Sequence, residues 1–235
     1  MTHSVVKPLE RKVLRDTVYD SLVDMLMSGS LAPGEPLSID GLASELQVSP
    51  TPVREALVHL ERTGLVSRAP LRGYRVAPPL SAEQVSQLFD ARLILELGAL
   101  DLAFENAATL AVELAKAQER HERAAVQVAG VAPEKASVSA YRAYMDADWS
   151  FHHAIFRYSH NAYLLSMADA LPAHLHRLRQ SVTRGVQDSE LAVGEHALVL
   201  HAVRQGDQAS ARQALHDHIV NVKGRSLRDE HSAAS

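Results

Sequence analysis

The sequence predicts a mainly α-helical protein with two parts: an N-terminal winged helix-turn-helix domain with a small β-hairpin wing, and a C-terminal all-α antiparallel helical bundle. Three observations predict this fold. Residues 40–62 contain two short apolar repeats at helical spacing, with a tight turn between them. After Gly64 the apolar period changes to two, which is typical of strands. From residue 82 to about residue 228 only helical periods occur, with breaks at short intervals.

A proline-rich junction divides the chain. The segment Ala77-Pro78-Pro79-Leu80 follows the wing, and two consecutive prolines favour a stiff, extended linker. A length of 235 residues leaves room for two modest domains. We therefore predict a winged helix-turn-helix domain over 1–77, a linker over 78–81, an all-α domain over 82–228 and a disordered tail over 229–235.

The first predicted helix spans residues 8–28 and is followed by a loop of helix breakers over residues 29–36. Four apolar side chains at helical spacing are expected to face the core: Val18, Leu22, Met25 and Leu26. The basic residues near its start either lie beside a nucleic-acid backbone or face solvent; they are Lys7, Arg11, Lys12 and Arg15.

Two short helices come next. Asp40 is a suitable N-cap for the first, and Val48 and Ser49 form the turn after it. The second begins near Pro50, because proline is tolerated in the first turn of a helix, and it ends before Gly64. One face of it is apolar: Val53, Ala56, Leu57 and Leu60. Helices joined in this way form a helix-turn-helix, whose second helix fits the major groove of DNA.

The predicted wing consists of strands over 65–67 and 74–77. Its tip contains Arg68, Arg72 and Gly73. Arginine supplies charge and glycine permits close backbone approach, so this tip is suited to phosphates or a minor groove. The alternative is an ordinary hairpin on a helical domain that does not bind DNA.

Six helices are predicted after the linker. Ser81 caps the first, with Glu83 and Gln84 in its first turn. Pro172 should kink the fourth, because proline removes a backbone donor. The predicted helices span residues 82–105, 107–129, 134–158, 161–184, 188–204 and 207–228.

Histidine is concentrated after the linker, since 11 of the 13 histidines lie after residue 81. Asp148 and His152, four residues apart on one helix, share a face and can reach one ion. His196 and His218 lie on the fifth and sixth helices, which a bundle can bring to the same interior point. One carboxylate and three imidazoles suit Zn²⁺, Ni²⁺ or Mn²⁺.

Spacing alone does not distinguish His196 from His201, or His218 from His216. The remaining bundle histidines singled out as solvent-facing are His121, His160, His174, His176, His216 and His231.

One run of residues is specific enough to indicate a family. It consists of Pro33-Gly34, Leu42-Ala43, Leu46, Val48-Ser49, Thr51-Pro52-Val53-Arg54-Glu55-Ala56-Leu57, Leu60-Glu61, Gly64-Leu65-Val66 and Arg72-Gly73. This run resembles the DNA-binding domain of the GntR family of bacterial transcription regulators.

The resemblance implies that Arg54 contacts a base or phosphate and Thr51 the DNA backbone. Arg72 and Gly73 enter the minor groove in the same picture, and Ser49 belongs to the predicted contacts. Many relatives carry Arg where this chain has Pro50, so one contact is expected to be missing.

A second resemblance covers nearly all of residues 82–225. It is carried by Asp148-Trp149-Ser150-Phe151-His152, Asn161, Glu195-His196, Gly206-Asp207, Ala211 and His218. These residues resemble the FCD effector domain of the FadR subfamily of GntR regulators. Many members of that type bind a divalent metal through the equivalents of Asp148, His152, His196 and His218. The effector, usually a small organic acid or sugar acid, lies on or beside the metal.

Two further residues are predicted to bind the effector. Arg92 is suited to hold a carboxylate through two hydrogen bonds; the alternative is a buried structural pair with Glu96. For Asn161 the alternative to an effector contact is a helix cap.

Composition limits the remaining possibilities. There is no run of about 18 apolar residues. The first residues lack a secretory apolar segment, and cysteine is absent; we therefore expect a cytoplasmic protein without a membrane partner. The net charge is −4, with 9 basic and 9 acidic residues in the first 80, so DNA affinity should depend on dimerisation.

These observations predict a regulator and not an enzyme. It would bind a pseudo-palindromic operator in double-stranded DNA as a homodimer, most simply as a repressor, and respond to a small carboxylate. One alternative is a metal-dependent enzyme that uses the three histidines and Asp148. Against it, the only nearby base in the sequence is Glu195, which should point away from His196. Another alternative is a metal-free bundle whose ligand fills a cavity.

Overall fold

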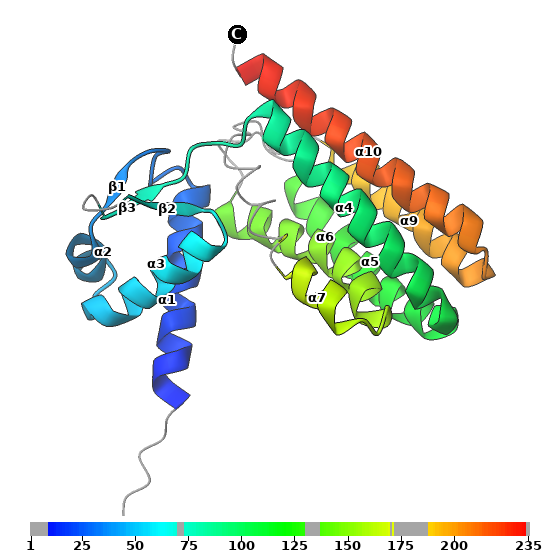
Figure 1. Ribbon diagram of the computed structural model, residues 1–235, viewed down its shortest axis with the longest axis horizontal. Helices are drawn as coiled ribbons and strands as arrows, with labels where there is room; N and C mark the ends of the chain where they lie inside the picture. Colours follow the sequence, from blue (N-terminus) through cyan, green and yellow to red (C-terminus); the bar gives the residue numbers. More distant parts are fainter. Residues whose placement is uncertain (1–8, 70–72, 130–136, 170, 172–187, 234–235) are drawn as a thin grey trace, which may run out of the picture. The chain divides into compact units, whose positions relative to one another are not determined.

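The computed structural model describes residues 9–69, 73–129, 137–169, 171 and 188–233 (Figure 1). The chain divides into two compact units, Met1–Pro79 and Leu80–Ser235, and the division falls between residues of the predicted linker. The mainly α-helical fold class is confirmed, with a small antiparallel sheet in the first unit and a helical second unit.

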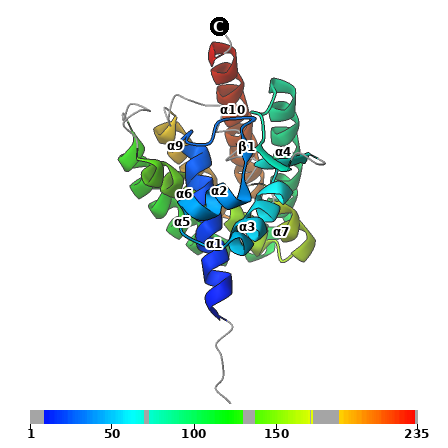
Figure 2. The ribbon, with the colours of Figure 1, turned by 90° about the vertical axis from the view of Figure 1, so that its left-hand side faces the viewer.

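The first unit is the predicted winged helix-turn-helix. Its elements are α1 (Leu9–Met27), β1 (Pro36–Leu37), α2 (Ile39–Glu45), α3 (Pro50–Arg62), β2 (Val66–Ala69) and β3 (Gly73–Val76). Both α1 and α2 pack against α3 (Figures 1 and 2). The core between them contains Val18, Leu22, Leu42, Val53 and Leu57.

Helix α3 forms where the sequence predicts it. Proline occupies its first turn, and the apolar face Val53, Ala56, Leu57 and Leu60 is fully buried. Gly64 ends the helix with a φ of +75°, a conformation that favours glycine. The N–H of Leu65 bonds the carbonyl of Leu60, and that of Gly64 bonds the carbonyl of Glu61, so the terminal carbonyls are satisfied.

The sheet contains a strand that was not predicted. Its order is β1-β3-β2, and Pro36 and Leu37 of β1 pair with Arg75 and Tyr74 of β3. Residues 29–36 were expected to form only a loop. A two-residue strand is too short to show an alternating period, and proline is acceptable here because β1 lies at the edge of the sheet. The hairpin begins one residue later than predicted, at Val66, and extends to Ala69.

The second unit is a helical bundle. Its elements are α4 (Ala82–Ala103), a 3-10 turn (Phe104–Asn106), α5 (Ala107–Val128), α6 (Val138–Tyr158), α7 (Ala162–Ala168), α9 (Ser189–Gln205) and α10 (Gln208–Ala233). Figure 1 shows the long helices side by side, with α5 packed against α6 and α9, and α10 packed against α9 and α4. Because these long helices contribute to one core, residues far apart in the sequence meet in its interior.

The ends of two helices differ most from the predictions. Helix α7 ends at Ala168, whereas a single helix was predicted over 161–184. Pro172 has no N–H to bond the Ala168 carbonyl, which favours an end there; the predicted kink at Pro172 lies outside the described residues. Helix α10 continues to Ala233, so 229–233, predicted as disordered tail, is helical. No glycine or proline interrupts the chain after Gly224, which explains the longer helix.

Within the described part of the chain, none of the helices combines the length and the apolar character needed to cross a bilayer.

Candidate functional site

The exposed face of α3 carries the predicted DNA contacts. Thr51 and Arg54 are exposed in the first two turns of the helix. Ser49 is the N-cap residue and is also exposed, and its hydroxyl makes no capping hydrogen bond. Arg54 shares its surface with Arg15 of α1 and Arg62 of α3, which line a groove of about 510 Å³ together with Glu55, Val58 and His59. Three arginines and one carboxylate therefore line this groove, and Arg15 is ion-paired with Asp16.

The wing is only partly described. Gly73 begins β3 with a φ of +74°, and among the described residues other than its chain neighbours no atom lies within 4 Å of the position where a Cβ would stand. Arg68 lies over the ring of Tyr74, 5.6 Å from its centroid. Arg72, the predicted minor-groove residue, lies outside the described residues.

Three histidines meet inside the bundle. His152 of α6, His196 of α9 and His218 of α10 are all buried, and their nearest ring nitrogens are the Nε2 atoms. The Nε2 of His196 lies 3.1 Å from that of His152 and 3.2 Å from that of His218. The predicted grouping of these three residues is therefore seen in the structure, and the three nitrogens are close enough to share one ion.

Carboxylates form hydrogen bonds with the Nδ1 atoms of two of the three rings. His152 Nδ1 donates to Glu96 Oε2 at 2.6 Å, and His218 Nδ1 donates to Glu195 Oε2 at 2.9 Å. We infer these tautomers from the partners, because an ionised carboxylate can only accept. In the neutral form with its single proton on Nδ1, each of these rings would present the lone pair of Nε2 to the centre of the cluster.

Both carboxylates are ionised. Burial raises the pKa of Glu96, but the charges of Arg92 and His152 and the hydrogen bonds from them outweigh it and lower the pKa to about 2. Burial likewise opposes the ionisation of Glu195, yet the hydrogen bonds from Arg225 and His218 lower its pKa to about 2.

The spacing of the three nitrogens fits a metal ion. Ligand atoms about 2.0–2.1 Å from a tetrahedral zinc ion lie about 3.3–3.4 Å from one another, and those of an octahedral ion lie somewhat closer. The two distances from His196 Nε2, 3.1 and 3.2 Å, lie between the values for the two geometries, and the third pair of nitrogens lies within 4.8 Å. Lone pairs on His152 Nε2 and His218 Nε2 would both point toward His196 Nε2, which lies near each of them. They would repel one another unless a proton or a cation lay among the three atoms.

Asp148 lies at the side of this cluster. Its Oδ1 is 3.8 Å from His196 Nε2 and 3.6 Å from the Nε2 of His121. Burial raises the pKa of Asp148, but His152, His121, His218 and Arg92 together hold it below its ordinary value. Asp148 thus belongs to a second possible metal-binding group, with His121 and His196, and it is not part of the group formed by His152, His196 and His218.

His121 was predicted to face solvent, and this prediction is wrong. It is fully buried on α5, with its Nδ1 3.1 Å from the Nδ1 of His196. The signal that could have found it is the buried period of α5, which runs through Leu110, Leu114, Ala117, His121, Ala125 and Val128.

Burial lowers the pKa of three of the buried imidazoles and so favours their neutral form. Burial lowers the pKa of His196 well below 6.5, and the neighbouring histidines and Arg92 add to this effect. Burial also lowers the pKa of His218, more than the hydrogen bond to Glu195 raises it. In His121 burial again dominates the pKa, against the charge of Asp148. Neutral imidazole is the form that binds a metal.

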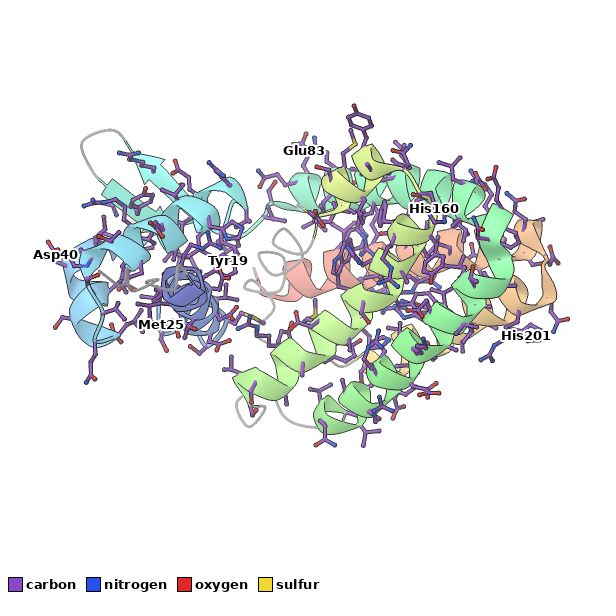
Figure 3. All side chains as sticks on the ribbon, turned by 90° about the horizontal axis from the view of Figure 1, so that it is seen from below. Tyr19, Met25, Asp40, Glu83, His160 and His201 are labelled. Carbon is purple, nitrogen blue, oxygen red and sulfur yellow. The ribbon has the colours of Figure 1, made fainter. Side chains whose placement is uncertain are left out.

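The two histidines that spacing could not distinguish from the cluster, His201 and His216, lie outside it. His201 is exposed on α9 and projects from the bundle (Figure 3), and His160 is exposed after α6. His216 is partly exposed and pairs with Asp217. His174, His176 and His231 lie outside the residues whose side chains are described.

The predicted effector residues have clear local partners. Arg92 donates from Nε to Glu96 Oε1 at 2.7 Å, so the predicted structural pair is present, and its Nη2 lies 3.4 Å from His152 Nε2. The guanidinium therefore borders the three nitrogens. Asn161 Oδ1 accepts from the N–H groups of Tyr163 and Leu164, which makes it the N-cap of α7.

The one nearby base expected from the sequence is already engaged. Glu195 accepts hydrogen bonds from His218, Asn221 and both terminal nitrogens of Arg225. A carboxylate with four such bonds and a pKa of about 2 is a poor general base. This arrangement does not favour the hydrolytic alternative.

Comparison with known proteins identifies both parts of the chain. Residues 14–76 match the family of bacterial regulatory proteins named gntR, and residues 87–221 match the FCD domain. The HTH-type transcriptional regulator LutR of Bacillus subtilis (strain 168) is 30% identical over 220 residues, which cover 85% of this chain and 94% of LutR. The gluconate operon transcriptional repressor of Bacillus licheniformis is 25% identical, with 85% and 79% covered.

A solved structure agrees with this result. That of E. coli McbR/YncC is similar with a TM-score of 0.69 and 25% identity, covering 92% of this chain and 97% of that one. The helix-turn-helix, the helical second unit and these matches together show that the chain belongs to the GntR family of DNA-binding bacterial transcription regulators, with an FCD domain, and is not an enzyme.

Proposed function

We propose that this regulator is a repressor that binds a pseudo-palindromic operator as a homodimer and is released by a small organic or sugar acid bound at a metal ion. The observation that carries this proposal is the group of three buried histidine nitrogens in the same chain as an exposed recognition helix. One of the similar proteins, the gluconate operon protein, is named as a repressor, which supports that sign of regulation.

DNA would be contacted from α3 and the wing. Arg54 and Thr51 project from the exposed face of α3, Ser49 lies at its start, and Arg72 and Gly73 belong to the wing. A major-groove helix reads base edges with its N-terminal residues, where Thr51 and Arg54 lie. Arg15 and Arg62, which line the same groove as Arg54, would add phosphate contacts.

The metal would be held by His152, His196 and His218, with Asp148 as a fourth ligand. Three imidazoles and one carboxylate suit Zn²⁺ or Ni²⁺, with Mn²⁺ also compatible. When bound, the ion supplies Lewis-acidic positions that a carboxylate can occupy. Glu96 and Glu195 orient two of the rings and increase their basicity through the Nδ1 hydrogen bonds.

Arg92 would hold the effector carboxylate. Its side chain is buried beside His152, and its single hydrogen bond to Glu96 leaves further N–H groups on the guanidinium. An anion bound between Arg92 and the ion would contact residues of α4, α6, α9 and α10 at once. Coupling between effector binding and DNA binding requires that the anion make different contacts in two arrangements of these helices. Asn161 would contact the effector only if its side chain gave up the two capping hydrogen bonds to α7.

The bundle would supply the dimer interface. Helices α4 and α7 pack against each other, and both expose large apolar side chains, namely Ile94, Tyr163 and Met167. Such exposure on neighbouring elements marks an interaction surface. A two-fold axis through this surface would present two copies of α3 to a symmetric DNA site.

Selection from a random double-stranded DNA library tests the proposal, because it does not require a known operator sequence. The protein should enrich sequences with two inverted half-sites, and a set of small organic acids should then be screened for release of the enriched DNA, with and without added Zn²⁺. Release that needs both the acid and Zn²⁺ supports the proposal. Enrichment of asymmetric single sites, or release that is independent of metal, contradicts it.

A further inference from the structure

The three clustered histidines differ in the group that contacts the Nδ1 atom of each ring. His152 and His218 each donate from Nδ1 to a carboxylate, of Glu96 and Glu195 respectively. His196 has an imidazole in the corresponding place, since its Nδ1 lies 3.1 Å from the Nδ1 of His121. The rings of His121 and His196 are tilted by 46°, with their centroids 4.9 Å apart. His121 comes from α5, a helix that contributes none of the three clustered nitrogens.

One proton must lie between the two Nδ1 atoms if they are hydrogen-bonded. A metal at the three Nε2 atoms requires the lone pair of His196 Nε2, so the single proton of that ring must be on Nδ1. The Nδ1 of His121 must then accept this proton in a hydrogen bond. The proton of His121 itself is consequently on Nε2, which lies 3.6 Å from Asp148 Oδ1.

The opposite arrangement of protons is disfavoured by Asp148. If His121 donated from Nδ1, its Nε2 would direct a lone pair at the carboxylate of Asp148, and two acceptors would face each other in a buried site. In the structure the His121 Nε2 is buried and has no hydrogen bond within 3.5 Å among the described residues. A proton on this nitrogen gives it an attractive contact with Asp148, whereas a lone pair gives it a repulsive one.

We propose that His121 is a positioning residue of the metal site, which accepts a hydrogen bond from His196 Nδ1 and thereby keeps His196 Nε2 unprotonated and directed at the ion. Through its own Nε2 it also orients Asp148, so that one residue of α5 sets the geometry of ligands on α6 and α9. This inference rests on the proposed metal site. It goes beyond that site because His121 is not one of the three histidines proposed as its ligands.

Two substitutions separate hydrogen bonding from packing. In His121→Phe the ring remains but the acceptor is lost, and the dissociation constant for Zn²⁺ should rise by about 10-fold to 100-fold, as for other residues that hold a ligand. In His121→Asn the Oδ1 can stand near the position of Nδ1 and accept from His196, so most of the affinity should return. Competition with a chromophoric chelator at pH 7.5 measures both values in the full chain.

Gln118 provides the matched control. It lies on the same face of α5, is buried, and donates to Glu122 and to the carbonyl of Val193 on α9, and among the described residues neither hydrogen bond reaches a clustered histidine. Gln118→Met should leave the dissociation constant for Zn²⁺ within about twofold of the wild-type value, whatever its effect on stability.

Imidazole ¹⁵N spectra add a readout that packing alone would not change. In the zinc-loaded wild type His196 should show its proton on Nδ1 and His121 on Nε2. Equal zinc affinity in wild type and His121→Phe, equal loss in the Phe and Asn variants, or a proton on Nδ1 of His121 would overturn the inference. Absence of zinc binding by the wild type would instead overturn the proposed metal site.

Discussion

At the scale of single residues, a few side chains determine what the molecule can bind. The three Nε2 atoms of His152, His196 and His218 converge because each ring is fixed from behind by a hydrogen bond. This arrangement costs stability at acidic pH, since burial disfavours protonation of imidazole and the clustered side chains are buried. On the first unit, Arg54 is exposed and free to face DNA.

Replacing Arg54 with alanine should weaken operator binding by about fivefold to more than a hundredfold, since a base contact of this type contributes about 1–3 kcal/mol. Fluorescence anisotropy with the selected DNA measures the change. Arg123→Ala is the control, because Arg123 is an exposed arginine of α5. Full affinity in Arg54→Ala would show that α3 does not read the groove as described.

The buried histidines also predict how stability depends on pH. The pKa values of His196, His218 and His121 are lowered in the folded chain, whereas in the unfolded chain each titrates near 6.5. Below pH 6.5 the unfolded chain therefore binds more protons, and the free energy of unfolding falls as the pH falls. Each histidine contributes up to about 1.4 kcal/mol per pH unit in this window.

Urea unfolding of the metal-free protein at pH 7.5 and pH 5.5 measures this effect. His196→Phe should reduce the difference between the two pH values. His201→Gln, which removes an exposed histidine of the same helix, should leave it unchanged. Equal pH dependence in all three proteins would mean that the cluster does not titrate as inferred.

At the scale of elements, the sequence predicts most clearly what depends on local periodicity. The apolar face of α3, its start at Pro50 and its end at Gly64 follow from rules that act within one helix. Strand β1 could not be predicted, because it exists only through pairing with β3, about 38 residues later. The burial of His196 was in principle visible, since it shares a period with Ala192, Val199 and Val203.

The metal cluster was predictable only in part, for the same physical reason. Spacing places Asp148 and His152 on one face of α6, but their distance to residues of α9 and α10 depends on how the helices pack. The contact between His121 and His196 joins residues 75 positions apart and leaves no local signal. Family resemblance supplied the choice of His196 and His218, and it supplied nothing about His121.

Helix α4 has a start that can be tested directly. Ser81 accepts from the N–H of Gln84, and the Gln84 side chain accepts from the N–H of Ser81, which is a capping box. Ser81→Ala should lower the free energy of unfolding of the bundle by about 1 kcal/mol. Ser86→Ala, within the same helix, should have no such cost, because alanine is the better residue in a helix interior. Urea unfolding of both variants distinguishes them, and equal stability would contradict a capping role for Ser81.

At the scale of the whole molecule, we assign DNA reading to the first unit and propose sensing and dimerisation for the second. The division of the chain at Pro79 leaves residues 80–235 with a core of their own. The charge balance of the first 80 residues, 9 basic and 9 acidic, gives a single head little general affinity for DNA. Two heads on one dimer raise the effective concentration of the second half-site contact.

The chain lacking residues 1–79 should therefore remain a dimer, which sedimentation equilibrium measures. Ile94→Glu, a charge on the exposed apolar surface of α4, should shift it toward the monomer, and Val126→Glu on α5 should not. A monomeric bundle in the absence of substitutions would place the dimer contacts in the first unit instead.

The most direct measurement is the zinc content of the full chain after equilibrium dialysis against buffered Zn²⁺, compared with that of a variant in which His152, His196 and His218 are alanine. We predict one zinc ion bound per wild-type chain and none at this site in the variant, with the fold of the variant checked by circular dichroism. A wild-type chain without zinc, or a folded variant that binds as much zinc as the wild type, would contradict the metal-based sensor.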